Sequence, residues 1–138
     1  MTNSITITTT INAPIEKIWT AWNEPEHITK WAFASDDWEV PAATNDLTVG
    51  GTFVTTMVAK DKSASFDFTG TYTEVIPNEK IAYTIPDGRM VEITFQKTGE
   101  NEYCITEEFQ MENIHPEERQ REGWTAILEN FKKYVANN

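Results

Sequence analysis

The sequence has little cysteine, few basic residues and no long apolar run. Its single cysteine, Cys104, excludes a disulfide within the chain and any cysteine-based zinc site. Eleven Lys and Arg face 22 Asp and Glu, a net charge of -11. General nucleic-acid binding and binding to anionic lipid membranes both need a cationic surface, so we expect neither. No apolar stretch approaches the roughly 20 residues that span a bilayer, and residues 1–4 do not resemble a signal peptide, so a soluble cytoplasmic protein is expected.

Motifs that would signal a cofactor are also missing. The sequence contains no Walker loop, no dinucleotide-binding fingerprint and no Gly-x-Ser-x-Gly elbow. The two histidines, His27 and His115, have no partner at metal-ligand spacing. Cys104 is out of phase with its apolar neighbours and is expected to be an ordinary thiol. The sequence therefore predicts no cofactor and no metal.

What is present is a pattern of strands and amphipathic helices in one domain covering residues 1–138. A Thr-rich alternating segment predicts a strand over residues 4–11, and helical spacing predicts short helices over 14–22 and 25–31. Period-two alternation then predicts six strands joined by short turns, which require antiparallel pairing. These six strands are expected at 38–40, 52–59, 65–76, 80–85, 89–97 and 102–111.

The last segment predicts a long amphipathic helix that begins at Pro116. Apolar residues from Trp124 to Val135 recur every three or four positions over about 20 residues, a length of about 30 Å. This order of elements predicts an α+β fold with the helices on one face of an antiparallel sheet. Since a long antiparallel sheet curves, we expect a cavity between its concave face and this helix.

Five segments in the same order resemble the AHSA family, which comprises homologues of the activator of the heat-shock-protein-90 ATPase. Residues 13–22 are similar to the family's A-P-x-x-x-V-W-x-A-W opening, and residues 25–31 to its P-E-x-I-x-x-W segment. Residues 46–53 are similar to D-x-x-V-G-G-x-F, and residues 70–79 to G-x-Y-x-E-V-x-P-x-E. Residues 123–131 are similar to its G-W-x-x-x-L helix. Together these segments extend over nearly the whole chain.

The resemblance implies the START-like, polyketide-cyclase-like helix-grip fold. That fold has a curved antiparallel sheet of about seven strands, two short helices after the first strand, and a long C-terminal helix across the concave face. In the activator that names the family, a separate N-terminal domain also makes contacts with the chaperone, and we expect no room for such a domain in this chain. The family name therefore does not transfer ATPase activation to this chain.

Alternation along the strands predicts which side chains face the last helix. Such residues either pack as an ordinary core or line a pocket with large apolar walls and few polar groups. Trp19, Trp22 and Trp31 either cap the mouth of this pocket or pin the short helices to the sheet. The predicted cavity residues are Trp31, Phe33, Phe53, Met57, Phe66, Phe68, Tyr72, Tyr83, Ile93, Phe95, Ile105, Glu107, Phe109, Trp124, Leu128 and Phe131.

Glu107 is the unusual member of this set. Strict alternation directs its carboxyl inward, between Ile105 and Phe109, where burial is costly unless the group is paired or protonated. A carboxyl with a raised pKa in a cavity is suited to general acid or base catalysis. Alternatively, a β-bulge or a solvated strand end would turn Glu107 outward.

Three functions are compatible with these features. The leading hypothesis is a non-catalytic domain, monomeric or homodimeric, that binds a hydrophobic or amphipathic small molecule. The second is a cyclase-like or hydrolytic enzyme that uses Glu107 with Tyr72, Tyr83 or Tyr103. The third is a protein-interaction module, either a co-chaperone or a stress-response partner, whose acidic surface would meet a basic patch.

Overall fold

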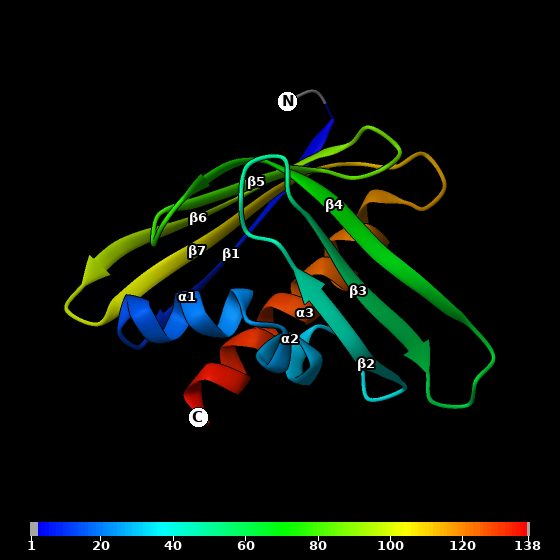
Figure 1. Cartoon of the computed structure of the whole chain (residues 1–138), viewed down its shortest axis with the longest axis horizontal. Coiled ribbons are helices and arrows are strands. Elements are labelled where there is room, and N and C mark those ends of the chain that lie inside the picture. The colour runs from blue at the N-terminus through cyan, green and yellow to red at the C-terminus, as the bar shows by residue number, and fades with distance from the viewer. Residues whose placement is uncertain (1–2, 138) are drawn as a thin grey trace.

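The computed structural model describes residues 3–137 and shows a curled sheet with three helices against its inner side (Figure 1). No helix in this part of the chain is long and apolar enough to cross a membrane. The elements in chain order are β1 (Ser4–Asn12), α1 (Ile15–Asn23), α2 (Pro25–Trp31), β2 (Trp38–Asn45), β3 (Thr52–Ala59), β4 (Ser65–Ile76), β5 (Lys80–Thr84), β6 (Met90–Gly99), β7 (Glu102–Gln110) and α3 (Glu117–Ala136).

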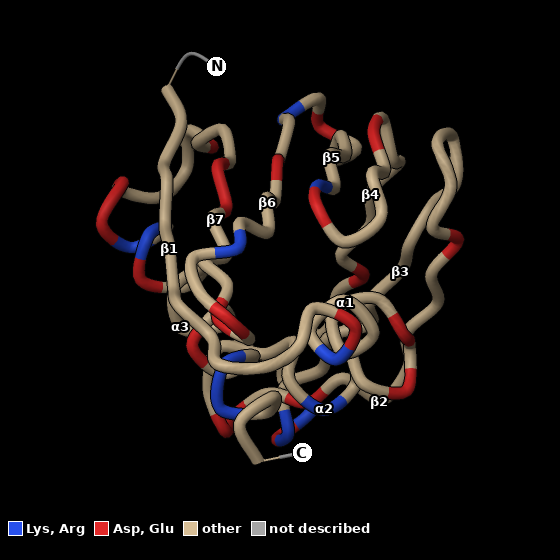
Figure 2. The backbone as a smooth tube through the Cα atoms, turned by 90° about the vertical axis from the view of Figure 1, so that its left-hand side faces the viewer, with Lys and Arg blue, Asp and Glu red and all other residues tan. Residues whose placement is uncertain are grey.

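The seven strands form one antiparallel sheet in the order β1-β7-β6-β5-β4-β3-β2. Strands β2 to β7 follow one another as a meander, and β1 pairs with β7 at the far edge. Figure 2 shows the strands curling into an arch, with the helices between its two ends. The α+β helix-grip architecture predicted from the sequence is therefore confirmed.

Two prolines start the short helices. Pro14 is the N-cap of α1, with φ of -64°, and Pro25 is the first residue of α2, where a missing N–H leaves no hydrogen bond unmade. The indole N–H of Trp31 donates a 2.8 Å hydrogen bond to the carbonyl of Ala21 and ties the two helices together. The amide of Asn130 donates to the carbonyl of Trp31 at 2.8 Å, which anchors α3 to the same unit.

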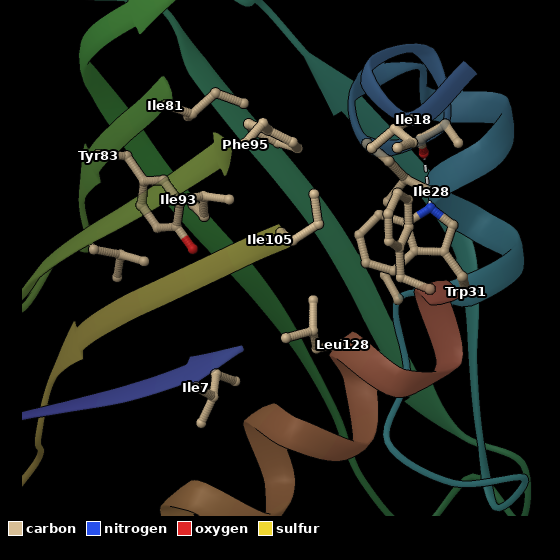
Figure 3. Close-up of a cluster of buried hydrophobic side chains, with 14 of the residues drawn as sticks. Ile7, Ile18, Ile28, Trp31, Ile81, Tyr83, Ile93, Phe95, Ile105 and Leu128 are labelled. Carbon is tan, nitrogen blue, oxygen red and sulfur yellow. Dashed lines mark hydrogen bonds between the residues drawn. The ribbon is translucent and has the colours of Figure 1, made fainter. Parts of the chain in front are cut away.

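Helix α3 is not centred under the sheet but packs mainly against β1. Its buried residues include Leu128, Phe131 and Val135, while Glu117 and Glu118 occupy its first turn, where the helix dipole favours anions. In Figure 3, Leu128 points toward Ile105 on β7 and lies close to Ile7 on β1. The β1–β7–β6 side of the arch is thus filled by side chains, and the β2–β5 side is less covered.

The prediction that β2 ends at Val40 is wrong, because the strand continues through Pro41 to Asn45. β2 is an edge strand, where a proline need not donate to a neighbour, and its register with β3 shifts between Glu39 and Ala42. The extension places Asn45 beside the interior of the arch.

Candidate ligand-binding cavity

A cavity of about 640 Å³ lies between the β2–β5 side of the sheet and the N-terminal half of α3. Pockets for small molecules in proteins typically have volumes of about 300–1,000 Å³. Strands β2, β3, β4 and β5 supply ten of the 24 wall residues, Glu107 comes from β7, and the helices and loops supply the rest. Of the described residues, none from β1 or β6 lines this cavity. Its walls are mainly aromatic and aliphatic.

Four aromatic rings on three adjacent strands form one side of the cavity. Phe53 lies with its ring centroid 4.8 Å from that of Tyr83 and 5.6 Å from that of Phe68. Tyr72 joins the group, 5.5 Å from Phe53. These rings meet because Gly70 leaves room on β4: a Cβ added there would lie 2.5 Å from Phe53 and 2.9 Å from Tyr83.

The hydroxyl of Tyr72 belongs to a chain of hydrogen bonds. It donates to Oδ1 of Asn45 at 2.5 Å, and the Asn45 amide donates to the carbonyl of Asn23 at 2.8 Å. Burial raises the pKa of the Tyr72 phenol, with a smaller contribution from the nearby Asp46 carboxylate. Tyr72 is therefore a neutral, already bonded wall residue.

Glu107 faces the cavity, as strict alternation predicts. The pairing of β7 with β1 and β6 is regular at this position, where Glu107 lies opposite Ile7 and Ile93, so no β-bulge turns it outward. Its exposed fraction is 5%, and burial raises the pKa of its carboxyl from 4.5 to about 8. Among residues 3–137, no side chain or backbone group forms a hydrogen bond or ion pair with this carboxyl. Glu107 is thus buried, unpaired and directed at open space.

The hydroxyl of Tyr83 is a second unbonded polar group in the wall. Figure 3 shows it pointing from β5 into the interior of the arch, and no described residue is hydrogen-bonded to it. Burial raises the pKa of the Tyr83 phenol well above its usual value. Electrostatic interactions with Glu107 and Tyr72 raise this pKa further, and the charge of Arg89 lowers it. The phenol is therefore neutral and free to bond to a ligand.

The exposed members of the wall mark where the cavity meets solvent. They are Phe66, which is 50% exposed on β4, and His115 and Arg119 near the start of α3. Gln120 holds this rim in place, because its amide accepts from the Glu112 N–H at 3.0 Å and donates to the His115 carbonyl at 2.8 Å. The ring of His115 also bonds to the Glu112 carboxylate, which lowers the pKa of that carboxyl.

Gly123, in the N-terminal half of α3, lines the cavity. A glycine inside a helix costs about 1 kcal/mol relative to alanine. No atom lies within 4 Å of the position that a Cβ would occupy there, so packing does not require the glycine. Because glycine has no side chain, the cavity is larger at this position than it would be with any other residue.

Of the sixteen predicted cavity residues, nine lie in the wall and seven do not. The nine are Trp31, Phe53, Met57, Phe66, Phe68, Tyr72, Tyr83, Glu107 and Trp124. The seven that must be reassigned from the wall to the packed interior are Phe33, Ile93, Phe95, Ile105, Phe109, Leu128 and Phe131.

The helices explain this reassignment. Trp19 and Trp22 cover Phe95, with ring centroids 5.3 and 5.8 Å away, and Trp22 also packs on Phe131 at 4.8 Å. Trp124 covers Phe109. The tryptophans of the short helices thus pack against the sheet, and Trp22 and Trp31 also line the cavity, away from the exposed residues at its opening.

Several other predicted residues lie elsewhere. Tyr103 is on β7 outside the wall, so it is not placed beside Glu107 in the way that Tyr83 is. Cys104 is half-buried and 3.8 Å from the Thr106 hydroxyl. The His27 ring is 2.5 Å from the Tyr134 hydroxyl and links α2 to α3. Within the described chain, no group of three or more His, Cys, Asp or Glu side chains is arranged to hold a metal ion.

The sequence prediction missed the polar part of the wall. Asn23, Asn45 and Thr55 line it, as do Arg89 and the Glu112–Gln120 rim. Alternation along β3 puts Thr55 on the same face as Phe53. However, β-branched threonine is common in strands, so its presence did not indicate a role in a binding site. The others lie in helices, an extended edge strand or loops, where alternation gives no information.

The curled sheet gripped by a C-terminal helix defines a helix-grip protein of the START-like class. A family model described as "Activator of Hsp90 ATPase homolog 1-like protein" matches residues 12–136, and the chain belongs to this AHSA1 family. The membership predicted from five short segments is therefore confirmed. No curated protein matches the chain.

Solved structures agree with this assignment. An AHSA1-like protein from Aeromonas hydrophila is 41% identical, with a TM-score of 0.90 over 97% of this chain and 92% of that one. Chr148 from Cytophaga hutchinsonii is 55% identical, with a TM-score of 0.85 over 99% of this chain and 94% of that one. CV1439 from Chromobacterium violaceum is 23% identical, with a TM-score of 0.84 over 98% of both chains, and shares the fold.

Proposed function

We propose that this chain binds a hydrophobic or amphipathic small molecule in the cavity between β2–β5 and α3. The observation that carries the proposal is the cavity itself, about 640 Å³ with mainly apolar walls and a few unbonded polar groups. Burial of apolar ligand surface would supply binding free energy at about 25 cal/mol per Å², less the cost of ordering the ligand. The exposed rim at Phe66 and Arg119 gives such a ligand a way in.

Gly123 allows a direct test, because a larger side chain there would enter the cavity without meeting any atom near its Cβ. Gly123→Leu is expected to fill part of the cavity and to lower affinity at least tenfold for aromatic compounds that bind the wild type. Gly123→Ala is the matched control: it adds one methyl group, keeps most of the space and stabilises α3 by about 1 kcal/mol.

Affinity is measured by calorimetric titration and folding by thermal unfolding. Equal affinity in the wild type and Gly123→Leu would place any binding outside the cavity. Absence of millimolar binding to the wild type across aromatic, lipid-like and polyketide-like compounds would refute the proposal.

A second candidate function is catalysis, favoured by one specific observation. The Glu107 carboxyl has a pKa of about 8 and lies near the Tyr83 phenol, so it holds a proton near neutral pH and is suited to general acid or base work. The test is turnover of a bound compound, followed by mass spectrometry, in the wild type and Glu107→Gln. Unchanged turnover in the variant would exclude this role for Glu107.

A further inference from the structure

Among the described wall residues, Glu107 is the only acidic or basic side chain that is buried. The others, Arg89, Glu112, His115 and Arg119, are half-buried or exposed. A carboxyl buried without a partner is costly, and the cost is relieved when a counter-ion or hydrogen-bond donors reach it. No described residue supplies either one, so the donors must come from water or from a ligand in the cavity.

Glu107, once ionised, and the Tyr83 hydroxyl can both accept hydrogen bonds from a ligand in the cavity. An ionised carboxylate is acceptor-only, and the unbonded Tyr83 hydroxyl accepts as well as donates. The rings of Phe53, Phe68 and Tyr83 meet on the same side of the cavity. Aromatic faces attract cations through their quadrupoles, and this attraction strengthens where water is excluded. Hydrogen-bond acceptors beside aromatic rings are suited to binding a cationic group of a ligand.

Of the remaining charges in the wall, that of Arg89 opposes a cation at the Tyr83 hydroxyl, but its ion pair with a carboxylate partly offsets this charge. Arg89 is paired with Asp87 at 2.7 Å, and Glu112 is paired with His115. Arg119 lies exposed at the rim. The chain as a whole carries a net charge of -11, which raises the local concentration of cations around it.

The geometry points to a hydrophobic amine as the ligand: its aromatic or aliphatic body occupies the cavity, and its ammonium group bonds to the Glu107 carboxylate and the Tyr83 hydroxyl. This inference rests on the proposed small-molecule function of the same cavity. It assigns Glu107 as the residue that determines ligand specificity and Tyr83 as a second acceptor.

Three compounds with the same ring system test it: 1-naphthylmethylamine, 1-naphthalenemethanol and 1-methylnaphthalene. They differ in carrying an ammonium, a hydroxyl or no polar group. With the wild type at pH 7.5, the amine is expected to bind at least tenfold more tightly than the alcohol. Glu107→Gln is expected to lower affinity for the amine at least tenfold and for the alcohol less than threefold.

Two further variants separate ligand contact from general damage. Tyr83→Phe is expected to weaken amine binding about threefold, because one acceptor is lost. Glu108→Gln removes the neighbouring carboxyl, whose side chain lies on the opposite face of β7 and accepts from Ser4 at 2.9 Å. This control is expected to bind the amine as the wild type does, and thermal unfolding verifies that all variants fold.

The outcomes distinguish this inference from the proposed function. If the alcohol or the hydrocarbon binds as tightly as the amine, or if Glu107→Gln binds the amine unchanged, the amine assignment is overturned while small-molecule binding stands. If none of the three compounds binds, the amine assignment fails, and the broader titrations with Gly123→Leu decide the cavity's role by themselves.

Discussion

The indole of Trp124 on α3 stacks on the ring of Phe109 on β7, with centroids 4.0 Å apart and planes inclined by 11°. The same indole lines the cavity and meets Phe68 on β4 edge-on at 6.1 Å. Trp124 therefore forms the boundary between the packed half of the arch and the open half. Its contact with Phe109 fixes how closely α3 approaches the sheet.

This stack is expected to couple α3 to β7 energetically. Trp124→Leu and Phe109→Leu should each destabilise the fold by about 2–4 kcal/mol, and the double-mutant cycle should give a coupling of about 1 kcal/mol. The ring pair of half-buried Trp38 and exposed Phe66, with centroids 5.7 Å apart, is the control and should couple less. Urea denaturation measures both cycles; equal couplings would contradict a special role for the stack.

Gly70 is expected to tolerate no side chain. Gly70→Ala places a Cβ 2.5 Å from the Phe53 ring and should destabilise the fold by about 2–3 kcal/mol while displacing the cavity's aromatic side. Gly99→Ala, whose Cβ would lie an ordinary 3.4 Å from Glu102, is the matched control and should change stability little. Thermal unfolding of the two variants makes the comparison, and similar losses in both would remove the steric explanation.

The buried carboxyl of Glu107 should make the protein less stable as pH rises. Its folded pKa of about 8 lies above the ordinary 4.5, so between these values the folded state holds a proton that the unfolded chain has released. The contribution of this group to stability is highest below pH 4.5 and falls until about pH 8, by on the order of 5 kcal/mol. The other titratable or charged groups in the wall are Tyr72, Tyr83, Arg89, Glu112, His115 and Arg119.

Glu107→Gln removes this dependence. The variant should be close to the wild type in stability at pH 4.5 and more stable at pH 9, as measured by denaturant unfolding across the range. Glu108→Gln, on the outer face of the same strand, should keep the wild-type fall. A wild type and Glu107→Gln with parallel pH profiles would show that Glu107 is solvated in solution.

Affinity for an amine should follow the ionisation of the same carboxyl. Below pH 8 only the ionised fraction of Glu107 can pair with an ammonium, so affinity for 1-naphthylmethylamine should rise by up to about tenfold per pH unit from pH 6 to 8. Affinity for 1-naphthalenemethanol should stay nearly constant. His115→Gln controls for the rim histidine and should leave the amine's pH dependence intact; a flat profile for the amine in the wild type would argue against the pairing.

Much of the fold was predictable because its local signals agree with one another. Pro14 and Pro25 mark the starts of the short helices, and alternation placed Glu107 on the inner face against the usual preference for a solvated carboxylate. The exception was β2, which was predicted to end at Val40 but continues to Asn45 as an edge strand with a shifted register. Proline positions and side-chain alternation thus predicted the elements correctly wherever the strands and helices are regular.

The shape of the cavity was less predictable, since it depends on where α3 lies across the sheet. Alternation cannot tell Phe109, which Trp124 covers, from Tyr83, which faces open space. Arg119 and Gln120 line the cavity together with Phe66 and Phe68 of β4, although these residues are far apart in the sequence. These positions depend on packing between segments that are distant in the sequence. The spacing of residues along the chain therefore does not predict them.

The most direct test of the cavity's role is an NMR titration of isotope-labelled protein with 1-naphthylmethylamine and 1-naphthalenemethanol. We expect shifts and intermolecular NOEs at Phe68, Tyr83 and Trp124, lost in Gly123→Leu and retained in Gly123→Ala. Shifts confined to the outer face of the sheet, or none with either compound at millimolar concentration, would contradict ligand binding inside the arch.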